Sequence, residues 1–450
     1  MANLIEPEWQ GLDLAGLRLL LKMRIGGPGQ YDGRDKNRNA FYLPQARSLC
    51  KVKLTFSGKK IIAVEPGPAF DPAEWKQIRG EVEKALLSGA PKVGREYSFC
   101  TSRATRWWRG TRSGVQIIPP PEDAPRAGLD EGADHPFILE FPLKASTLQE
   151  ITNQRRIRVH RQLTLLLNVL LRGHTTFQLP RSRHVWATDL DHGFESKWVC
   201  ESFFANLGPI VIDSLSEIKG ERVEEVEPHE YYASFGDDGQ GLRVPSDLDD
   251  SICRYLHLAS ANRAKFDRAA FWLDMASRQW TTSVSAAFAC LVSAVESLTE
   301  RGATHRVYCA KCGRESSHDA PGATEGFRMF FEKYAPGLGH KKQRNEMYSL
   351  RSGILHGSDL MEIDQDITFG WDPPGWNELE LSRELWSVTR TAMRNWLREP
   401  PTTPDSVEET PLGRDGNSMI LGGVVYASIG VLAGIVGIRL LRYLRQRYSH

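Results

Sequence analysis

The residues best suited to chemistry in this sequence lie in the run Leu350-Arg351-Ser352-Gly353-Ile354-Leu355-His356-Gly357. An arginine is always charged and binds phosphate in a two-pronged fashion, better than a lysine does. A histidine, with an unperturbed pKa of about 6.5, exists in both protonation states at neutral pH. Arg351 and His356 are therefore the candidate catalytic residues. The alternative is that Arg351 pairs with a carboxylate and His356 only caps a helix.

The geometry of a helix constrains this pair. Residues five apart on an ideal helix are separated by about 140° around its axis, so Arg351 and His356 share a face only if Gly353 loosens the turn or the long arginine wraps around. Gly357 is expected to end the helix as its C-cap. Glu296 lies near the edge of another helix's apolar stripe, where it either orients Arg351 or is an exposed glutamate.

Helical periodicity dominates the sequence after about residue 245. Apolar residues recur at three- and four-residue steps around Phe266 to Trp280, Val284 to Leu298 and Leu385 to Trp396, and a further helix carries Met347, Leu350 and Ile354. Amphipathic helices joined by modest connections are expected to pack as a bundle over residues 246–400, with one longer excursion between Arg301 and Thr324.

The Arg-x4-His pair, placed in a helical bundle after a helix ending Ala-Val-Glu-Ser-Leu, resembles the HEPN superfamily, and the Leu-Arg-Ser-x-x-x-His-Gly form resembles its Apea-like branch. The resemblance covers residues 250–400. It implies that two bundles pair so that both motifs line one cleft, where RNA is cut without a metal cofactor. Arg351 would then bind the scissile phosphate, and His356 would move protons. Ser352 stands where active members often have a larger polar residue.

The leading hypothesis is therefore a membrane-anchored, dimeric, metal-independent endoribonuclease of the HEPN type that acts in prokaryotic anti-phage defence. A second hypothesis, from another class, is a non-catalytic HEPN bundle that binds RNA, a nucleotide or a protein partner. A third is an oligomerisation scaffold, which predicts no RNA affinity at any salt concentration.

The excursion within the helical region carries four residues of zinc-ligand type: His305, Cys309, Cys312 and His318. A Cys-x-x-Cys-Gly turn is typical of zinc knuckles, and a structural zinc ion could order a loop with little apolar content. One Cys-x-x-Cys is half of the usual signature, however, and the histidine spacings are not those of a standard finger. A zinc site and a plain reduced loop are both open.

Residues 1–245 indicate a mixed α and β region with a sensor or regulatory role. The sequence predicts a hairpin from Val52–Phe56 and Lys60–Val64, a helix from Asp71-Pro72 toward Gly89, a strand at Phe137–Phe141, and a helix over about 145–171 whose arginines form a solvated face. A second candidate site, for nucleic acid, consists of Arg106, Trp107, Trp108 and Arg109. Its alternative is that the tryptophans are core and the arginines are rim.

Composition places the chain in a reducing compartment. Lys and Arg number 57 against 56 Asp and Glu, so no global field recruits a polyanion, and the seven cysteines are too scattered for a disulfide framework. Glu6 and Glu8, with Arg18, Lys22 and Arg24, argue against a secretory signal peptide.

The C-terminal end predicts a membrane anchor. A Pro-rich, acidic linker over 401–417 leads to residues 418–438, which carry no charge and, as a helix of about 1.5 Å per residue, would span a bilayer of roughly 30 Å. A basic tail, 439–450, follows. A buried core helix is the alternative, and it would need a polar stripe that this segment lacks. The sequence thus predicts an α+β region, an all-α bundle and one C-terminal transmembrane helix in contact with lipid, with the body cytoplasmic although the basic tail favours the opposite orientation.

Overall fold

The computed structural model separates the chain into two compact units, residues 1–401 and 402–450. All described residues belong to the first unit. They comprise 71–87, 89–122, 124, 135–176, 207–233, 241–299, 323–337, 341–365 and 376–401, and the strand segments 30–32, 40–44, 51–57, 60–66, 185–189, 195–199, 305–308 and 315–318. For the strand segments, only the backbone pairing is considered below.

The first described elements form a four-stranded antiparallel meander in the order β1-β2-β3-β4, with bounds Gln30–Asp32, Ala40–Pro44, Lys51–Ser57 and Lys60–Pro66. The hairpin predicted around Ser57-Gly58 is confirmed, because β3 pairs with β4 through Ser57 and Lys60. Helix α2 (Pro72–Leu87) follows, and its first turn is capped by Asp71, whose Oδ1 accepts from the Ala73 N–H at 3.0 Å. The predicted order of cap and proline is therefore confirmed.

A second sheet provides the framework of the middle of the chain. Its path is β12-β5-β8-β7-β6, with β9 also paired to β5, and the bounds are β5 Ala90–Cys100, β6 Trp108–Arg109, β7 Gln116–Ile118, β8 His135–Ala145, β9 Thr175–Thr176 and β12 Val211–Ile212. Strands β5 and β8 pair antiparallel along their whole length. The predicted strand 137–141 lies inside β8, and its alternate residues Phe137, Leu139 and Phe141 are fully buried, as a half-covered sheet requires.

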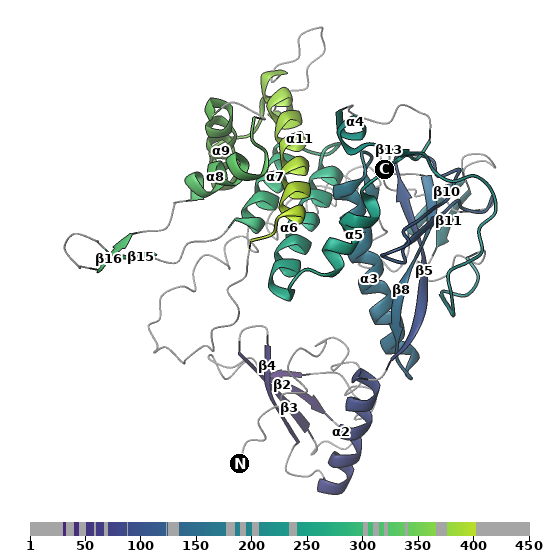
Figure 1. The fold of residues 1–450 in the computed structure, drawn as a ribbon. Helices are drawn as coiled ribbons and strands as arrows, with labels where there is room; N and C mark the ends of the chain where they lie inside the picture. The colour runs from purple at the N-terminus through teal and green to yellow at the C-terminus, as the bar shows by residue number, and fades with distance from the viewer. Residues whose placement is uncertain are drawn as a thin grey trace, which may run out of the picture. The chain divides into compact units, whose positions relative to one another are not determined.

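Helix α3 (Gln149–Leu170) lies along the β5–β8 pair (Figure 1), and its last two turns are almost entirely buried. One of its arginines departs from the expected solvated face: Arg156 is only 5% exposed and forms an ion pair with Glu96 of β5. Burial lowers the pKa of Arg156 to about 10. A buried arginine needs such a partner, because an isolated charge inside a protein is costly.

The rest of the described chain is mainly helical. Its elements are α4 Pro228–Ala233, α5 Leu248–Leu256, α6 Ser260–Gln279, α7 Val284–Leu298, α8 Ala323–Tyr334, α9 Lys341–His356, α10 Glu362–Gln365 and α11 Trp376–Arg398. Three short strand pairs also lie in this part of the chain. They are β10 Val185–Asp189 with β11 Glu195–Val199, β13 Glu225–Val226 with β14 Val244–Pro245, and β15 His305–Tyr308 with β16 Glu315–His318. Helices α6 to α9 and α11 pack on one another (Figure 1), which is the bundle that periodicity predicts.

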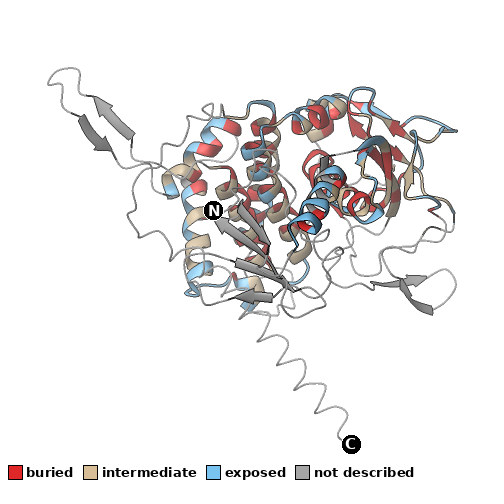
Figure 2. Cartoon of the chain, turned by 90° about the horizontal axis from the view of Figure 1, so that it is seen from below, coloured by how far each residue is buried: buried red, intermediate tan, exposed pale blue. Residues whose placement is uncertain are grey.

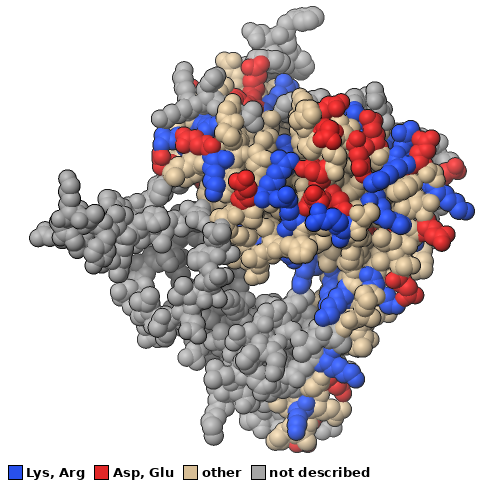
Figure 3. All heavy atoms as spheres, in the orientation of Figure 1, with Lys and Arg blue, Asp and Glu red and all other residues tan. Residues whose placement is uncertain are grey.

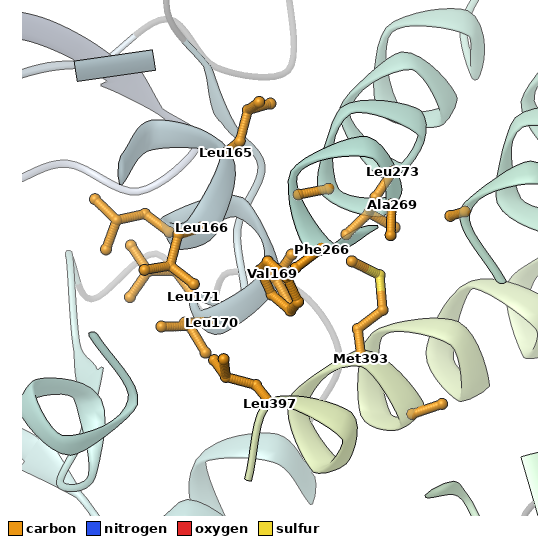
Figure 4. Packing of buried hydrophobic residues seen from close by; sticks show 14 of the residues in the cluster. Leu165, Leu166, Val169, Leu170, Leu171, Phe266, Ala269, Leu273, Met393 and Leu397 are labelled. Carbon is orange, nitrogen blue, oxygen red and sulfur yellow. The ribbon is translucent and has the colours of Figure 1, made fainter. Parts of the chain in front are cut away.

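The hydrophobic core runs through both the sheet region and the helices. One cluster of buried residues includes Phe137 and Val169 from before residue 245 and Phe266, Leu273 and Trp396 from after it. Figure 4 shows α3, α6 and α11 contributing neighbouring side chains, and Figure 2 shows buried residues concentrated on the inward sides of the elements. The sequence boundary near residue 245 therefore lies within a shared core.

The prediction of a C-terminal transmembrane helix is corrected by the structure. In the part of the chain that the structure describes, no helix is long and apolar enough to cross a bilayer. The segment on which the prediction was based, 418–438, and its flanks, 402–417 and 439–450, lie outside the described residues. The fold is mixed α and β, and the single-pass anchor, its lipid contact and the localisation derived from it are not supported.

Candidate functional site

Arg351 lies in the middle of the last turns of α9, facing α7. Its Nη2 donates to Oε2 of Glu296 at 2.9 Å, and the two side chains are only 19% and 17% exposed. The arginine Nε is buried with no hydrogen-bond partner. Glu296 is therefore not an exposed glutamate. The contact agrees both with a carboxylate that orients Arg351 and with the alternative in which Arg351 simply pairs with a carboxylate. A largely buried, charge-assisted pair of this kind holds its members more firmly than a surface pair does.

Tyr348, one turn before Arg351 on α9, completes this cluster and was missed in the sequence. Its ring lies 5.6 Å from the guanidinium carbon of Arg351, within cation–π range. The pKa of its phenol is raised, first by burial and then by the carboxylate of Glu296, to which the phenol is hydrogen-bonded. The i, i+3 spacing of Tyr348 and Arg351 is the only sequence signal that could have indicated the contact.

His356 is the last residue of α9 and is exposed. The expected C-cap at Gly357 is confirmed: its φ is +72°, the Gly357 N–H donates to the Ile354 carbonyl at 3.2 Å, and the Ser358 N–H donates to the Gly353 carbonyl at 3.0 Å. These two bonds define a Schellman motif. The helix thus ends immediately after the histidine.

Gly353 does not loosen the helix, because α9 continues through it to His356. Its role is to provide space. A Cβ at this position would lie 2.7 Å from Oδ2 of Asp359, so the chain leaving the helix packs directly against the glycine. Ser352 is half-buried between the two candidate catalytic residues.

The segment after α9 is anchored to the first turn of α7. Asp364 accepts hydrogen bonds from Ser283 Oγ and from the backbone N–H groups of Val284 and Ser285, at 2.7–3.0 Å. The Met361 N–H donates to Ser285 Oγ at 2.9 Å. These bonds lower the pKa of the Asp364 carboxyl despite its burial, which alone would raise it. Helix α7 therefore supplies Glu296 near its own C-terminal end. With its N-terminal turn, it holds the segment that follows α9.

Within one chain, the two candidate catalytic residues point to different surroundings. Arg351 is held against α7, and His356 is exposed, as are Leu355 and Leu360. A single copy therefore offers one exposed imidazole and one guanidinium that is largely satisfied by a carboxylate.

The candidate zinc ligands lie in the β15–β16 hairpin. Backbone register pairs His305 with His318, and Cys309 and Cys312 lie outside the described residues, between the two strands. His305 is three strand steps from Tyr308, a distance of roughly 10 Å, whereas ligands must bond one zinc ion at about 2.0–2.3 Å. The described strands therefore place only the two histidines opposite each other. Among the described side chains, no group of three or more His, Cys, Asp or Glu residues is placed to hold a metal ion, and zinc stays a prediction.

The nucleic-acid candidates are used in contacts within the chain. Trp108 is 2% exposed and belongs to the core, while the Trp107 indole donates to the Gly220 carbonyl at 3.0 Å. Arg106 pairs with Glu221, and Arg109 donates to the Ser216 carbonyl at 2.8 Å. Figure 3 shows basic and acidic side chains intermixed over the described part of the face in view. This arrangement fits the reading of tryptophan as core and arginine as rim.

Another site that sequence reasoning missed is a buried polar cluster between β5 and α3. Ser98 Oγ and His160 Nε2 are 2.8 Å apart, and Ser98 Oγ is 3.1 Å from Thr164 Oγ1. Burial, with a smaller contribution from the charge of Arg156, lowers the pKa of His160 to about 3. A serine and a neutral histidine at hydrogen-bond distance resemble a nucleophile and its base. Ser98 is 0% exposed and His160 only 8%, so this pair is structural.

Compared with known proteins, the chain matches no protein family, no curated protein and no solved structure. The resemblance of residues 250–400 to the HEPN superfamily therefore stays a prediction. The geometry does not depend on this resemblance. In a mixed α/β protein, α7 and α9 together hold a Glu–Tyr–Arg cluster, and α9 itself ends in an exposed histidine.

Proposed function

We propose that this protein is a HEPN-type, metal-independent endoribonuclease that acts as a homodimer. The observation that supports the proposal is the position of Arg351, oriented by Glu296, five residues before an exposed His356 at a capped helix end. In the proposed dimer, each copy contributes one arginine and one histidine to a shared cleft. One imidazole removes the proton of a ribose 2′-hydroxyl, the other protonates the leaving 5′-oxygen, and guanidinium groups stabilise the phosphorane.

The test is RNA cleavage by the full chain in EDTA, compared with His356→Ala and Arg351→Ala. Each substitution should reduce the rate of RNA cleavage by about 10²-fold or more, because His356→Ala removes the proton-transfer group and Arg351→Ala removes the side chain that binds the phosphate. The matched control is His257→Ala, because His257 is likewise an exposed histidine at the C-terminal end of a helix, α5. Equal cleavage by the wild type and by His356→Ala would reject the mechanism.

The second candidate function is a bundle that binds RNA, a nucleotide or a protein without cutting it. The engagement of Arg351 by Glu296 and Tyr348 favours it, because an arginine already paired is less available to a scissile phosphate. Ser352, in place of a larger polar residue, is also consistent with it. Under this reading, RNA binding survives His356→Ala and no product ends with a 2′,3′-cyclic phosphate.

A further inference from the structure

Helix α11 carries two largely buried arginines, one turn apart, that are not paired with a carboxylate. Arg390 contacts the C-terminal end of α3, and Arg394 contacts Tyr232 of the short helix α4. Across the described parts of the chain, no Asp or Glu forms an ion pair with either of them, whereas Arg398, one turn further on, pairs with Asp247 at 2.7 Å. Two neighbouring cations in such a place are unfavourable unless something compensates them.

Part of the compensation for Arg390 comes from backbone carbonyls. Its Nη1 donates to the Arg172 carbonyl at 2.7 Å, and its Nη2 donates to the Asn168 carbonyl at 2.9 Å. Both carbonyls lie at the C-terminal end of α3, where the helix dipole is negative. The Nε of Arg390 stays buried with no partner, and burial lowers the pKa of the guanidinium. Arg390 therefore fixes α3 to α11, and Figure 4 shows Leu170 of α3 beside Leu397 of α11.

Arg394 has far less compensation. Its guanidinium carbon lies 3.6 Å from the centre of the Tyr232 ring, and among the described residues its one hydrogen bond is from Nη2 to Thr391 Oγ1, at 2.9 Å. Burial lowers its pKa to about 10, and the neighbouring charges of Arg390 and Arg398 act in the same direction. The Tyr232 hydroxyl donates to the Leu170 carbonyl at 2.7 Å, so the ring beneath the guanidinium is itself held in place. Arg394 is thus a cation held over a fixed ring, with a single hydrogen bond to the described part of the chain.

We propose that Arg394, with Arg390 behind it, binds the phosphate group of a small anionic ligand such as a pyrophosphate or a nucleotide. Both residues keep partial exposure to solvent. A guanidinium stacked on a fixed ring is already oriented, so little side-chain entropy is lost when it donates to a phosphate. The negative charge relieves the repulsion between the two arginines.

The experiment is calorimetric titration of the full chain with inorganic pyrophosphate and, separately, with ATP at low salt. Replacement of the cation in Arg394→Gln should weaken binding about tenfold or more, the effect of losing one charge-assisted hydrogen bond. The matched control is Arg222→Gln, because Arg222 also lies over an aromatic ring, that of Trp107, but has a carboxylate partner in Glu225. Its affinity should match that of the wild type.

A second variant protects the test against misfolding. Tyr232→Leu removes the ring beneath Arg394 but keeps its charge, and it should weaken binding to a smaller extent. Circular dichroism of each variant establishes that it is folded. Absence of pyrophosphate and ATP binding in the wild type, or equal affinity of the wild type and Arg394→Gln, would overturn the proposal. So would binding of RNA oligomers alone. Neither variant changes Arg351 or His356. A failure of the ribonuclease proposal is therefore distinguishable from a failure of the phosphate-binding proposal.

Discussion

At the scale of single residues, the Arg351–Glu296 pair has both a structural and a functional consequence. The two charges are largely removed from water and satisfy each other, so removing one leaves the other half-buried without a counter-ion. The same pair fixes the direction of the arginine in the proposed dimer. Glu296 therefore affects stability directly, and the proposed activity through the direction of Arg351.

Glu296→Gln should lower the free energy of unfolding by about 1–3 kcal/mol, because the neutral amide no longer balances the buried guanidinium. Urea unfolding followed by circular dichroism measures this change. The control is Glu325→Gln. Glu325 is the i, i+3 partner of Arg328, and its side chain is 42% exposed. This substitution should lower the free energy of unfolding by about 0.5 kcal/mol or less. Equal effects at the two sites would show that the buried pair adds no more than a surface pair.

His160 gives the protein a pH dependence of predictable sign. The folded state keeps this imidazole neutral, with a pKa lowered from 6.5 to about 3, whereas the unfolded chain protonates it near 6.5. The stabilisation is therefore fully present above pH 6.5 and decreases as the pH falls toward 3. In that window the unfolded state binds one more proton, which changes the free energy of unfolding by up to about 1.4 kcal/mol per pH unit.

The variant that tests this is His160→Gln. From pH 7 to pH 5, the wild type should lose about 2 kcal/mol more than the variant does, because only the wild type carries the buried imidazole. Urea unfolding at both pH values measures the difference. His257→Gln, at an exposed position, should retain the wild-type pH dependence. A pH dependence unchanged in His160→Gln would mean that the buried imidazole is not the cause.

At the scale of elements, the end of α9 decides where the candidate histidine lies. Gly357 adopts a left-handed φ of +72°, which a residue with a Cβ adopts only with strain. The Schellman bonds on either side depend on that conformation. A change at this glycine therefore displaces His356 and weakens the contact of the following segment with α7.

Gly357→Ala should lower the free energy of unfolding by about 1 kcal/mol and reduce RNA cleavage, if cleavage is present. Thermal unfolding measures the first effect. Gly326→Ala is the matched control: it lies within α8, with no atom within 4 Å of an added Cβ, and helix propensity predicts a gain of up to about 1 kcal/mol. The two substitutions are chemically identical, so opposite signs can come only from the backbone conformation.

Local signals in the sequence predicted many elements and few of their partners. Periodicity located the buried face of α11 correctly, since Leu385, Thr389, Ala392 and Trp396 are all 0% exposed. It could not show that Asp364 caps α7 or that Arg156 faces Glu96, because the partners lie far apart in the chain. Glu296 was found through its stripe position, whereas Tyr348 offered only its i, i+3 spacing from Arg351, and the Arg390–Arg394 pair carries no distinguishing local pattern.

At the scale of the whole first unit, residues 1–401, the packing of α3 against α6 and α11 joins the sheet region to the helical region. Val169 and Leu170 of α3 are 0% and 1% exposed, and they lie beside Phe266 and Leu397 (Figure 4). Removing the residues before 245 would expose apolar faces of α6 and α11 to water. The cost of burying such side chains incompletely is about 1.5–3 kcal/mol each, comparable with the margin of stability of a domain.

The helical region, 246–401, expressed without the preceding residues should therefore aggregate or remain loosely packed. The expected signs are binding of a hydrophobic dye, a broad thermal transition and elution at large size in gel filtration. The control fragment is 71–401, which keeps the sheet, α3 and the helices, and should unfold in one cooperative step. A well-folded 246–401 fragment with a sharp transition would show that the core divides at residue 245. In that case the candidate ribonuclease bundle folds without α3, and its activity can be measured on the isolated fragment.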